Sequence, residues 1–139
     1  NHFYVFDSFE GISKPSFEDL DYKNRSPKQG IFKADEEKIK NLFKEYNFID
    51  IKKGWIPERF KEVEEKKFSF VNIDVDIYEP TKRSLEFFFP RLVEGGCIHF
   101  DDYNFREWPG NKKAIKEFEE INKFSFSYEV PLGGYYIIK

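Results

Sequence analysis

The sequence predicts an α/β fold: a doubly wound, mostly parallel sheet that ends in an antiparallel hairpin. Two observations predict it. Short apolar runs alternate with segments of helical periodicity along the chain, and this order is typical of parallel strands connected by helices. The last two apolar runs, at 125–130 and 135–138, are separated by the residues PLGG, which favour a hairpin and therefore one antiparallel edge.

Each expected element has its own signal. Strands are predicted at short runs rich in aromatic and β-branched residues, and helices where apolar residues recur every three or four positions. Before the hairpin, the expected elements are a strand at 3–6, an irregular excursion at 13–30, a helix at 34–46, a strand at 48–51, a charged helix at 57–66, a strand at 68–73 buried on both faces, a helix at 78–92, a strand at 97–100 and a helix at 110–124. An excursion of that length in a compact domain is usually a functional lid or disordered.

Individual residues mark the expected helix ends. Asp35 favours the start of the first helix, and Pro57 suits the first turn of the second. Pro90 is expected to end or kink the helix at 78–92, and Gly95 and Gly96 to form the turn that follows. The first helix is expected to pack through one apolar face, formed by Ile39, Leu42, Phe43 and Tyr46.

Length and composition limit the function classes. The 139 residues suffice for one domain, spanning 1–139, and a net charge of −3 argues against nucleic-acid binding. No apolar run approaches the ~18 residues of a membrane span. The single Cys97 excludes a disulfide framework and indicates a reducing, cytoplasmic location. The chain contains no Met, so we expect it to be processed or part of a longer chain.

Aspartates gather where the predicted strands end. They are Asp7, Asp74, Asp76, Asp101 and Asp102. Ligands of doubly wound sheets bind beyond the C-terminal ends of the strands. Carboxylates that converge there repel one another unless a cation or hydrogen-bond donors intervene, and an all-oxygen set favours Mg²⁺ or Ca²⁺ over zinc. The alternative is that these residues cap the following helices; for Asp76, a metal ligand, a general base and a cap all remain open.

Several motifs in the same order also resemble a known family. They are DSFEG at 7–11, IDVDIYEPTKRSLE at 73–86, RLVEGG at 91–96, HFDDY at 99–103 and WPG at 108–110. Together they resemble the macrocin O-methyltransferase family, over residues 3 to about 118. The resemblance implies a class I S-adenosylmethionine-dependent enzyme with a three-layer, Rossmann-like sheet. It would transfer a methyl group, with the help of Mg²⁺, to a hydroxyl of a sugar or similar small molecule.

The resemblance also implies which residues carry the catalytic chemistry. Asp74, Asp101 and Asp102 match the Mg²⁺ ligands of the family. Asp76 matches the second acid of its D-x-D pair and is the candidate general base, so Asp74 and Asp76 are the expected catalytic residues. A bound metal would lower the pKa of the acceptor hydroxyl and orient it toward the methyl donor.

The expected cofactor-binding residues are Asp7, Ser8, Gly54, Trp55 and Asp74. Asp7 matches the acid that binds the ribose hydroxyls of S-adenosylmethionine. Trp55 would stack on the adenine or serve as a packing aromatic, and the sequence leaves both readings open. The expected partner is a small, glycosylated acceptor, with no nucleic acid or membrane involved, and a homo-oligomer is compatible with this reading.

Four further residues have both a functional and a structural reading. Trp108 and Tyr103 would line the acceptor pocket, although plain packing is the favoured reading for such an aromatic-rich chain. His99 is read as a packed histidine rather than a catalyst, and Cys97 as a small apolar residue of a strand.

One part of the family pattern is not found in this sequence. Class I methyltransferases begin with a strand and a glycine-rich turn that holds the methionine end of the cofactor, but the run at 3–6 already matches their second strand. We therefore expect a sheet that is incomplete at its N-terminal side and weak or no cofactor binding by this chain alone. Strands 3–6 and 68–73 should then pair directly or accept another chain between them. The alternative function is a truncated, inactive methyltransferase-like domain with a structural or interaction role.

Overall fold

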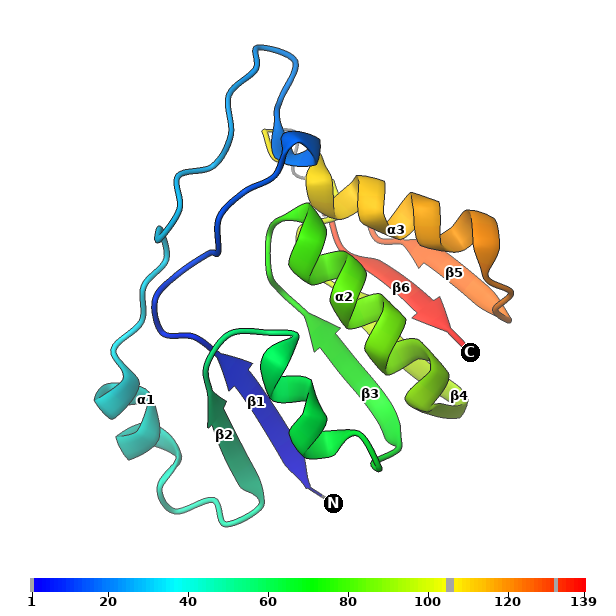
Figure 1. Cartoon of the computed structure of the whole chain (residues 1–139). Helices are drawn as coiled ribbons and strands as arrows, with labels where there is room; N and C mark the ends of the chain where they lie inside the picture. Colours follow the sequence, from blue (N-terminus) through cyan, green and yellow to red (C-terminus); the bar gives the residue numbers. More distant parts are fainter. Residues whose placement is uncertain (1, 105–106, 132) are drawn as a thin grey trace.

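Strands and helices alternate in the computed structural model, which describes residues 2–104, 107–131 and 133–139 (Figure 1). The strands are β1 (Phe3–Asp7), β2 (Ile49–Lys53), β3 (Phe68–Ile73), β4 (Leu92–Phe100), β5 (Phe126–Glu129) and β6 (Tyr135–Ile138). The α-helices are α1 (Glu36–Phe43), α2 (Tyr78–Phe88) and α3 (Gly110–Ile121), and the short 3₁₀ helices are η1 (Phe17–Asp19), η2 (Glu58–Val63) and η3 (Phe89–Arg91). This order confirms the predicted fold class.

The strands form two sheets. β1 pairs with β2 in parallel, and a separate sheet has the order β3-β4-β6-β5. In the second sheet β3 and β4 are parallel, whereas β6 runs antiparallel to both of its neighbours. The C-terminal hairpin therefore makes the antiparallel edge that PLGG predicted.

The expected direct pairing of the strands at 3–6 and 68–73 is wrong. Within the described residues, no backbone hydrogen bond joins β1 to β3, although the two strands run in the same direction (Figure 1). Aromatic side chains connect the sheets instead. The rings of Tyr4 in β1 and Phe68 in β3 lie 6.4 Å apart, and the ring of Phe6 in β1 lies 6.2 Å from that of Phe88 in α2, the helix that covers the second sheet. The other expectation, insertion of another chain between the strands, stays a prediction.

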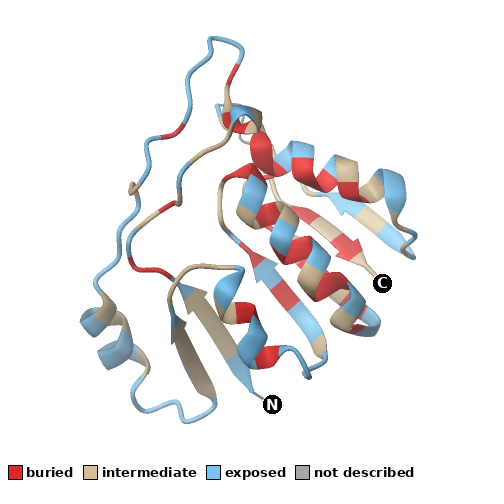
Figure 2. Ribbon diagram, in the orientation of Figure 1, coloured by how far each residue is buried: buried red, intermediate tan, exposed pale blue. Residues whose placement is uncertain are grey.

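Helices α2 and α3 cover one face of the four-stranded sheet, and the core lies between these helices and the sheet (Figures 1 and 2). Val71 and Ile73 of β3 point into that core, as do Ile98 and Phe100 of β4. The expectation that 68–73 is buried on both faces is wrong, because Phe70, the residue before Val71, is 52% exposed on the other face. Residues alternate between the two sides of a strand, so covering one face buries only every second residue.

Helix α1 does not pack as its periodicity suggested. Asp35 caps it as expected, accepting a hydrogen bond of 3.1 Å from the Lys38 amide. None of its residues is buried, however, and Leu42 is 65% exposed. Glu36 forms an ion pair with Lys53 of β2, so a charged contact joins the helix to the sheet.

Three further element boundaries can be compared with the sequence prediction; two differ from it and one agrees. The charged helix expected at 57–66 is the 3₁₀ helix η2, although its Phe60 and Val63 are buried as predicted. Gly95 and Gly96 lie inside β4 rather than in a turn before it. Pro90 ends α2 as expected, because the chain continues there as η3.

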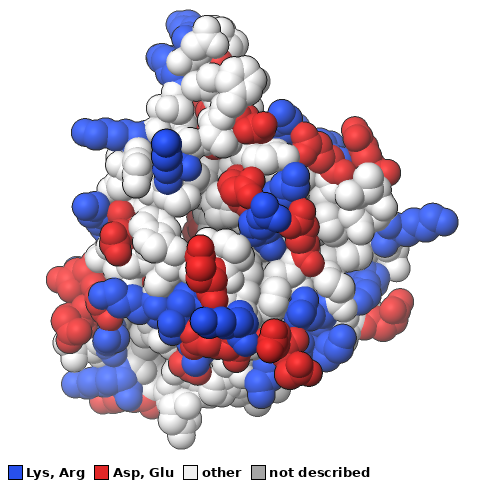
Figure 3. Space-filling model, viewed as in Figure 1, with Lys and Arg blue, Asp and Glu red and all other residues white. Residues whose placement is uncertain are grey.

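The surface is mixed in charge. On the face shown in Figure 3, Lys and Arg side chains are interspersed with Asp and Glu side chains. Ion pairs between neighbouring residues account for part of this pattern, for example Arg83 with Glu79 and Glu86. Among the helices of the described residues, none is both long and apolar enough to span a bilayer.

Candidate active site

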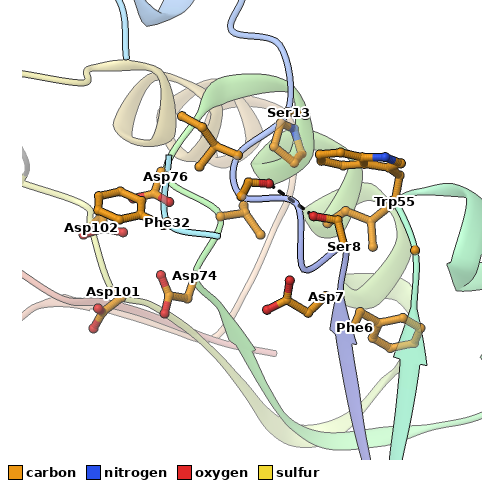
Figure 4. A pocket seen from close by; sticks show the side chains of 16 residues that line it. Phe6, Asp7, Ser8, Ser13, Phe32, Trp55, Asp74, Asp76, Asp101 and Asp102 are labelled. Carbon is orange, nitrogen blue, oxygen red and sulfur yellow. Dashed lines mark hydrogen bonds between the residues drawn. The ribbon is translucent and has the colours of Figure 1, made fainter. Parts of the chain in front are cut away.

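A cavity of about 430 Å³ lies beyond the C-terminal ends of β1 and β3 (Figure 4). All five strand-end aspartates line it: Asp7, Asp74, Asp76, Asp101 and Asp102. Their predicted convergence on one site is therefore confirmed. The volume falls in the range of ~300–1,000 Å³ that is usual for small-molecule sites.

One end of the cavity is formed by the loop after β1. Its turns are held by side chains: Oδ1 of Asp7 accepts a hydrogen bond of 2.7 Å from the Phe9 amide, and Oγ of Ser8 accepts one of 3.0 Å from the Glu10 amide. The Ser8 hydroxyl in turn donates to the Gly11 carbonyl at 3.2 Å (Figure 4). Asp7 and Ser8 are thus fixed at the wall of the cavity, while their cofactor-binding roles stay predictions.

Gly54 and Trp55 complete this end. The Gly54 amide donates to the Asp7 carbonyl at 2.9 Å, which ties the end of β2 to the end of β1. Gly54 has a φ of +136°, and a Cβ there would lie 2.8 Å from Cδ of Arg59, so only glycine fits without strain. This turn brings Trp55 into the cavity lining near Ser8 (Figure 4).

The other end of the cavity is acidic. One carboxylate oxygen each from Asp74, Asp76 and Asp102 lies within 4.8 Å of the other two. Oxygens on opposite sides of a Mg²⁺ ion at ~2.1 Å would be ~4.2 Å apart, so the group has the size and the all-oxygen chemistry of a site for a hard cation. The compact group contains Asp76 together with two of the three expected ligands, and the ligand role of Asp101 stays a prediction. Asp101 is exposed and lines the same cavity.

Crowding perturbs the acids of this group. Burial, followed by the negative charges of Asp102 and Asp74, raises the pKa of Asp76 to about 7. Burial and the charges of Asp102 and Asp101 also raise the pKa of Asp74. Burial and Asp101 raise the pKa of Asp102, against a hydrogen bond from Asp76 that lowers it. Asp76 is therefore the group best suited to exchange a proton near neutral pH.

The structure excludes the reading of Asp76 as a helix cap. The cap position of α2 is Ile77, and the first amide of the helix, that of Tyr78, is bound by Asp19 from the distant excursion at 2.7 Å. Asp76 itself has a left-handed φ of +62°. Of the three roles left open, a metal ligand and a general base remain.

Asp19 is a residue that the sequence analysis missed. It is fully buried, and its second oxygen accepts hydrogen bonds from the Ser16 amide at 2.7 Å and from the Ser16 hydroxyl at 2.9 Å. A Cβ at Gly110 would lie only 1.8 Å from Oδ1 of Asp19. The excursion is therefore anchored against the starts of α2 and α3. The Ser16-x-x-Asp19 spacing, which resembles a capping box, was the available signal.

The predictions for Tyr103, His99 and Trp108 have different outcomes. Tyr103 is almost fully buried and stacks on Tyr135 at 4.2 Å, so the packing reading is confirmed for it. His99 is not among the lining residues; its Nδ1 lies 2.6 Å from Oδ1 of Asn72. The Trp108 ring lies 5.7 Å from the ring of Phe32, which does line the cavity and which the sequence analysis did not single out.

Comparison with known proteins gives a consistent set of matches. The family model of macrocin O-methyltransferase (TylF) matches residues 1–129. The 8-demethyl-8-(2,3-dimethoxy-α-L-rhamnosyl)-tetracenomycin-C 4′-O-methyltransferase of Streptomyces olivaceus is 29% identical over 107 residues, which cover 72% of this chain and 41% of that protein. The demethyldecarbamoylnovobiocin O-methyltransferase of Streptomyces niveus is 26% identical over 136 residues, covering 91% of this chain and 50% of that protein.

Solved structures share the fold. The O-methyltransferase NovP superposes with a TM-score of 0.74 at 23% identity, and the calicheamicin methyltransferase CalS11 with 0.71 at 21%. Each superposition covers 99% of this chain and 60% of the other. The likeness confirms the predicted methyltransferase-like α/β fold, while the chain spans half or less of the length of the two curated relatives.

Proposed function

Because this chain belongs to the macrocin O-methyltransferase family, we propose that it carries the acidic part of the active site of an S-adenosylmethionine-dependent, Mg²⁺-dependent O-methyltransferase. The acceptor is a hydroxyl of a sugar or a similar small molecule. The observation that supports this most is the compact group of Asp74, Asp76 and Asp102 in the same cavity as Asp7 and Trp55.

The proposed division of labour follows the two ends of the cavity. Asp7, Ser8 and Trp55 hold the ribose and adenine of S-adenosylmethionine, which supplies the methyl group. Asp74 and Asp102 hold Mg²⁺, which lowers the pKa of the acceptor hydroxyl when bound. Holding donor and acceptor side by side in one cavity is the main source of acceleration for such a transfer.

Asp76 is the proposed general base. Its carboxylate would accept the proton of the acceptor hydroxyl as the oxygen forms its new bond to the methyl carbon and the bond between that carbon and the sulfonium sulfur breaks, leaving S-adenosylhomocysteine. Without a bound cation its pKa is raised to about 7, chiefly by burial, and a base whose pKa lies near the working pH is both deprotonated and basic enough. Asp101, exposed beside the group, adds negative charge that attracts the cation.

The names of the relatives support a sugar acceptor. One relative is named for a rhamnosyl-tetracenomycin, and one of the solved structures is described as a TDP-rhamnose 3′-O-methyltransferase. The proposed acceptor is accordingly a hydroxyl of a deoxyhexose, free or attached to a larger small molecule.

The experiment measures methyl transfer from radiolabelled S-adenosylmethionine to a panel of rhamnosides by the full-length protein. We expect transfer with Mg²⁺ and its loss in EDTA. Asp74→Asn and Asp76→Asn should abolish it, whereas Asp50→Asn, a matched change remote from the cavity lining, should retain it. Transfer that continues undiminished in EDTA would refute the metal-dependent mechanism.

One observation favours the alternative, a non-enzymatic interaction module. The neighbouring strands β1 and β3 are joined to each other by no backbone hydrogen bond in the described residues, and unpaired strand edges readily accept another polypeptide. Calorimetric titration with S-adenosylmethionine separates the two functions. Binding that depends on Asp7 supports the enzyme, and no binding by the full-length protein supports the module.

A further inference from the structure

Phe32 is exceptional among the residues that line the cavity. Phe32 is an apolar residue of the cavity lining, yet its side chain is 66% exposed. Its φ is +64°, a left-handed conformation that is strained for a residue with a bulky side chain. Strained residues of this kind persist where the surrounding structure fixes them, and they gather at binding sites.

The chain segments at the two ends of the excursion at 13–30 pair with each other and fix the backbone next to Phe32. The Ile12 amide donates to the Ile31 carbonyl at 3.0 Å, and the Gly30 amide donates to the Ile12 carbonyl at 3.0 Å. Gly11 permits this close approach, because a Cβ there would lie 2.1 Å from the Ile31 carbonyl oxygen. These two backbone hydrogen bonds therefore hold Phe32 at the cavity rather than leaving it on a free loop.

Phe32 gives the acidic end of the cavity an aromatic wall. Figure 4 draws its ring at the same end of the cavity as Asp76 and Asp102, while Trp55 lies at the other end near Ser8. The Trp108 ring, which precedes α3 in the chain, lies 5.7 Å from the Phe32 ring at an interplanar angle of 55°. A ligand at this end of the cavity can therefore contact both carboxylates and an aromatic ring.

A pyranose has the matching pair of surfaces. Its hydroxyls project from the edge of the ring, where a carboxylate group or its cation can bind them, and its C–H groups present an apolar face that packs on an aromatic ring. Building on the proposed function, we propose that Phe32, supported by Trp108, is a specificity-determining wall of the acceptor subsite. Its ring stacks on the C–H face of a deoxyhexose whose neighbouring hydroxyls face Asp76 and Asp102.

The test is binding of methyl α-L-rhamnopyranoside to the full-length protein in Mg²⁺, followed by saturation-transfer NMR. We expect saturation to be strongest on the C–H protons of one sugar face. Phe32→Ala should weaken binding roughly three- to tenfold, the size of effect of one aromatic contact, whereas Phe32→Tyr should bind like the wild type. The matched control is Phe17→Ala, which removes an 80% exposed ring from the excursion at 13–30 but not from the cavity lining, and should leave binding unchanged.

Three results would overturn the proposal. They are no binding of the rhamnoside by the wild type, equal binding by Phe32→Ala and Phe17→Ala, and preferential binding of catechol, which would assign the wall to a flat aromatic acceptor. The outcome is separable from that of the proposed function. Phe32-dependent binding without methyl transfer would keep the subsite and reject the enzyme, whereas methyl transfer to the rhamnoside that is indifferent to Phe32 would do the reverse.

Discussion

Replacing Gly110 by Ala would insert a methyl group into a buried hydrogen-bond network. The new Cβ would lie 1.8 Å from Oδ1 of Asp19 and 2.8 Å from the Tyr78 amide nitrogen. The Asp19 carboxylate would have to move, lose its 2.7 Å bond to that amide and leave a buried charge partly unpaired. We expect Gly110→Ala to lower the free energy of unfolding by about 2–4 kcal/mol, although Ala normally favours a helix.

The assay is urea unfolding followed by circular dichroism, with a double-mutant cycle. Asp19→Ala removes the group that the methyl would strike, so in that background the cost of Gly110→Ala should fall by at least about 1 kcal/mol. Gly95→Ala is the control: its φ is +73° but nothing lies within 4 Å of the added Cβ, so it should cost only about 1 kcal/mol of backbone strain. A Gly110→Ala protein as stable as the wild type, or strict additivity with Asp19→Ala, would refute the proposed network.

Three further predictions concern the cavity. Without metal, stability should fall as the pH rises from about 4 to about 7, because the pKa of Asp76 is raised to about 7 in the folded protein and the folded state therefore binds more protons than the unfolded chain in that range. At pH 8, the free energy of unfolding of Asp76→Asn in urea should accordingly exceed that of the wild type by about 1–2 kcal/mol, after allowance for the partial exposure of Asp76. A loss of stability would contradict this. Mg²⁺ or Ca²⁺ should raise the thermal midpoint of the wild type at pH 8 but not that of Asp74→Asn, as measured by scanning fluorimetry, and equal shifts in both proteins would argue against a specific site. Gly54→Ala should destabilise by about 1–3 kcal/mol in urea, because its φ of +136° and the Arg59 side chain 2.8 Å away leave no room for a methyl group, and a neutral result would show that the turn adapts.

Local sequence signals located most of the elements and the acids. The run at 68–73 ends before Asp74, and the run at 97–100 ends before Asp101, so parallel pairing alone brings these residues to the same edge of the sheet. The convergence of five aspartates on one cavity followed from that logic. The signal is local because strand ends are set by where an apolar run stops.

The errors arose where distant segments decide the outcome. The helix at 36–43 has an apolar face by periodicity, but whether that face is buried depends on what lies opposite, and Leu42 is 65% exposed. The strands at 3–7 and 68–73 share a direction, yet the rings between them replace backbone pairing. The sequence also did not indicate that Asp76 joins Asp74 and Asp102 in one compact group, because that depends on the side-chain directions after each strand.

The sequence by itself determined the alternation of strands and helices and the position of an aspartate at each relevant strand end. Both depend on neighbours within a few residues. Only the tertiary structure decided that Asp19 anchors the excursion across 59 positions to the amide of Tyr78, and that Phe32 lines the same cavity as the acids. Such contacts form between segments whose separation along the chain carries no periodic signal, so packing and buried hydrogen bonds select them.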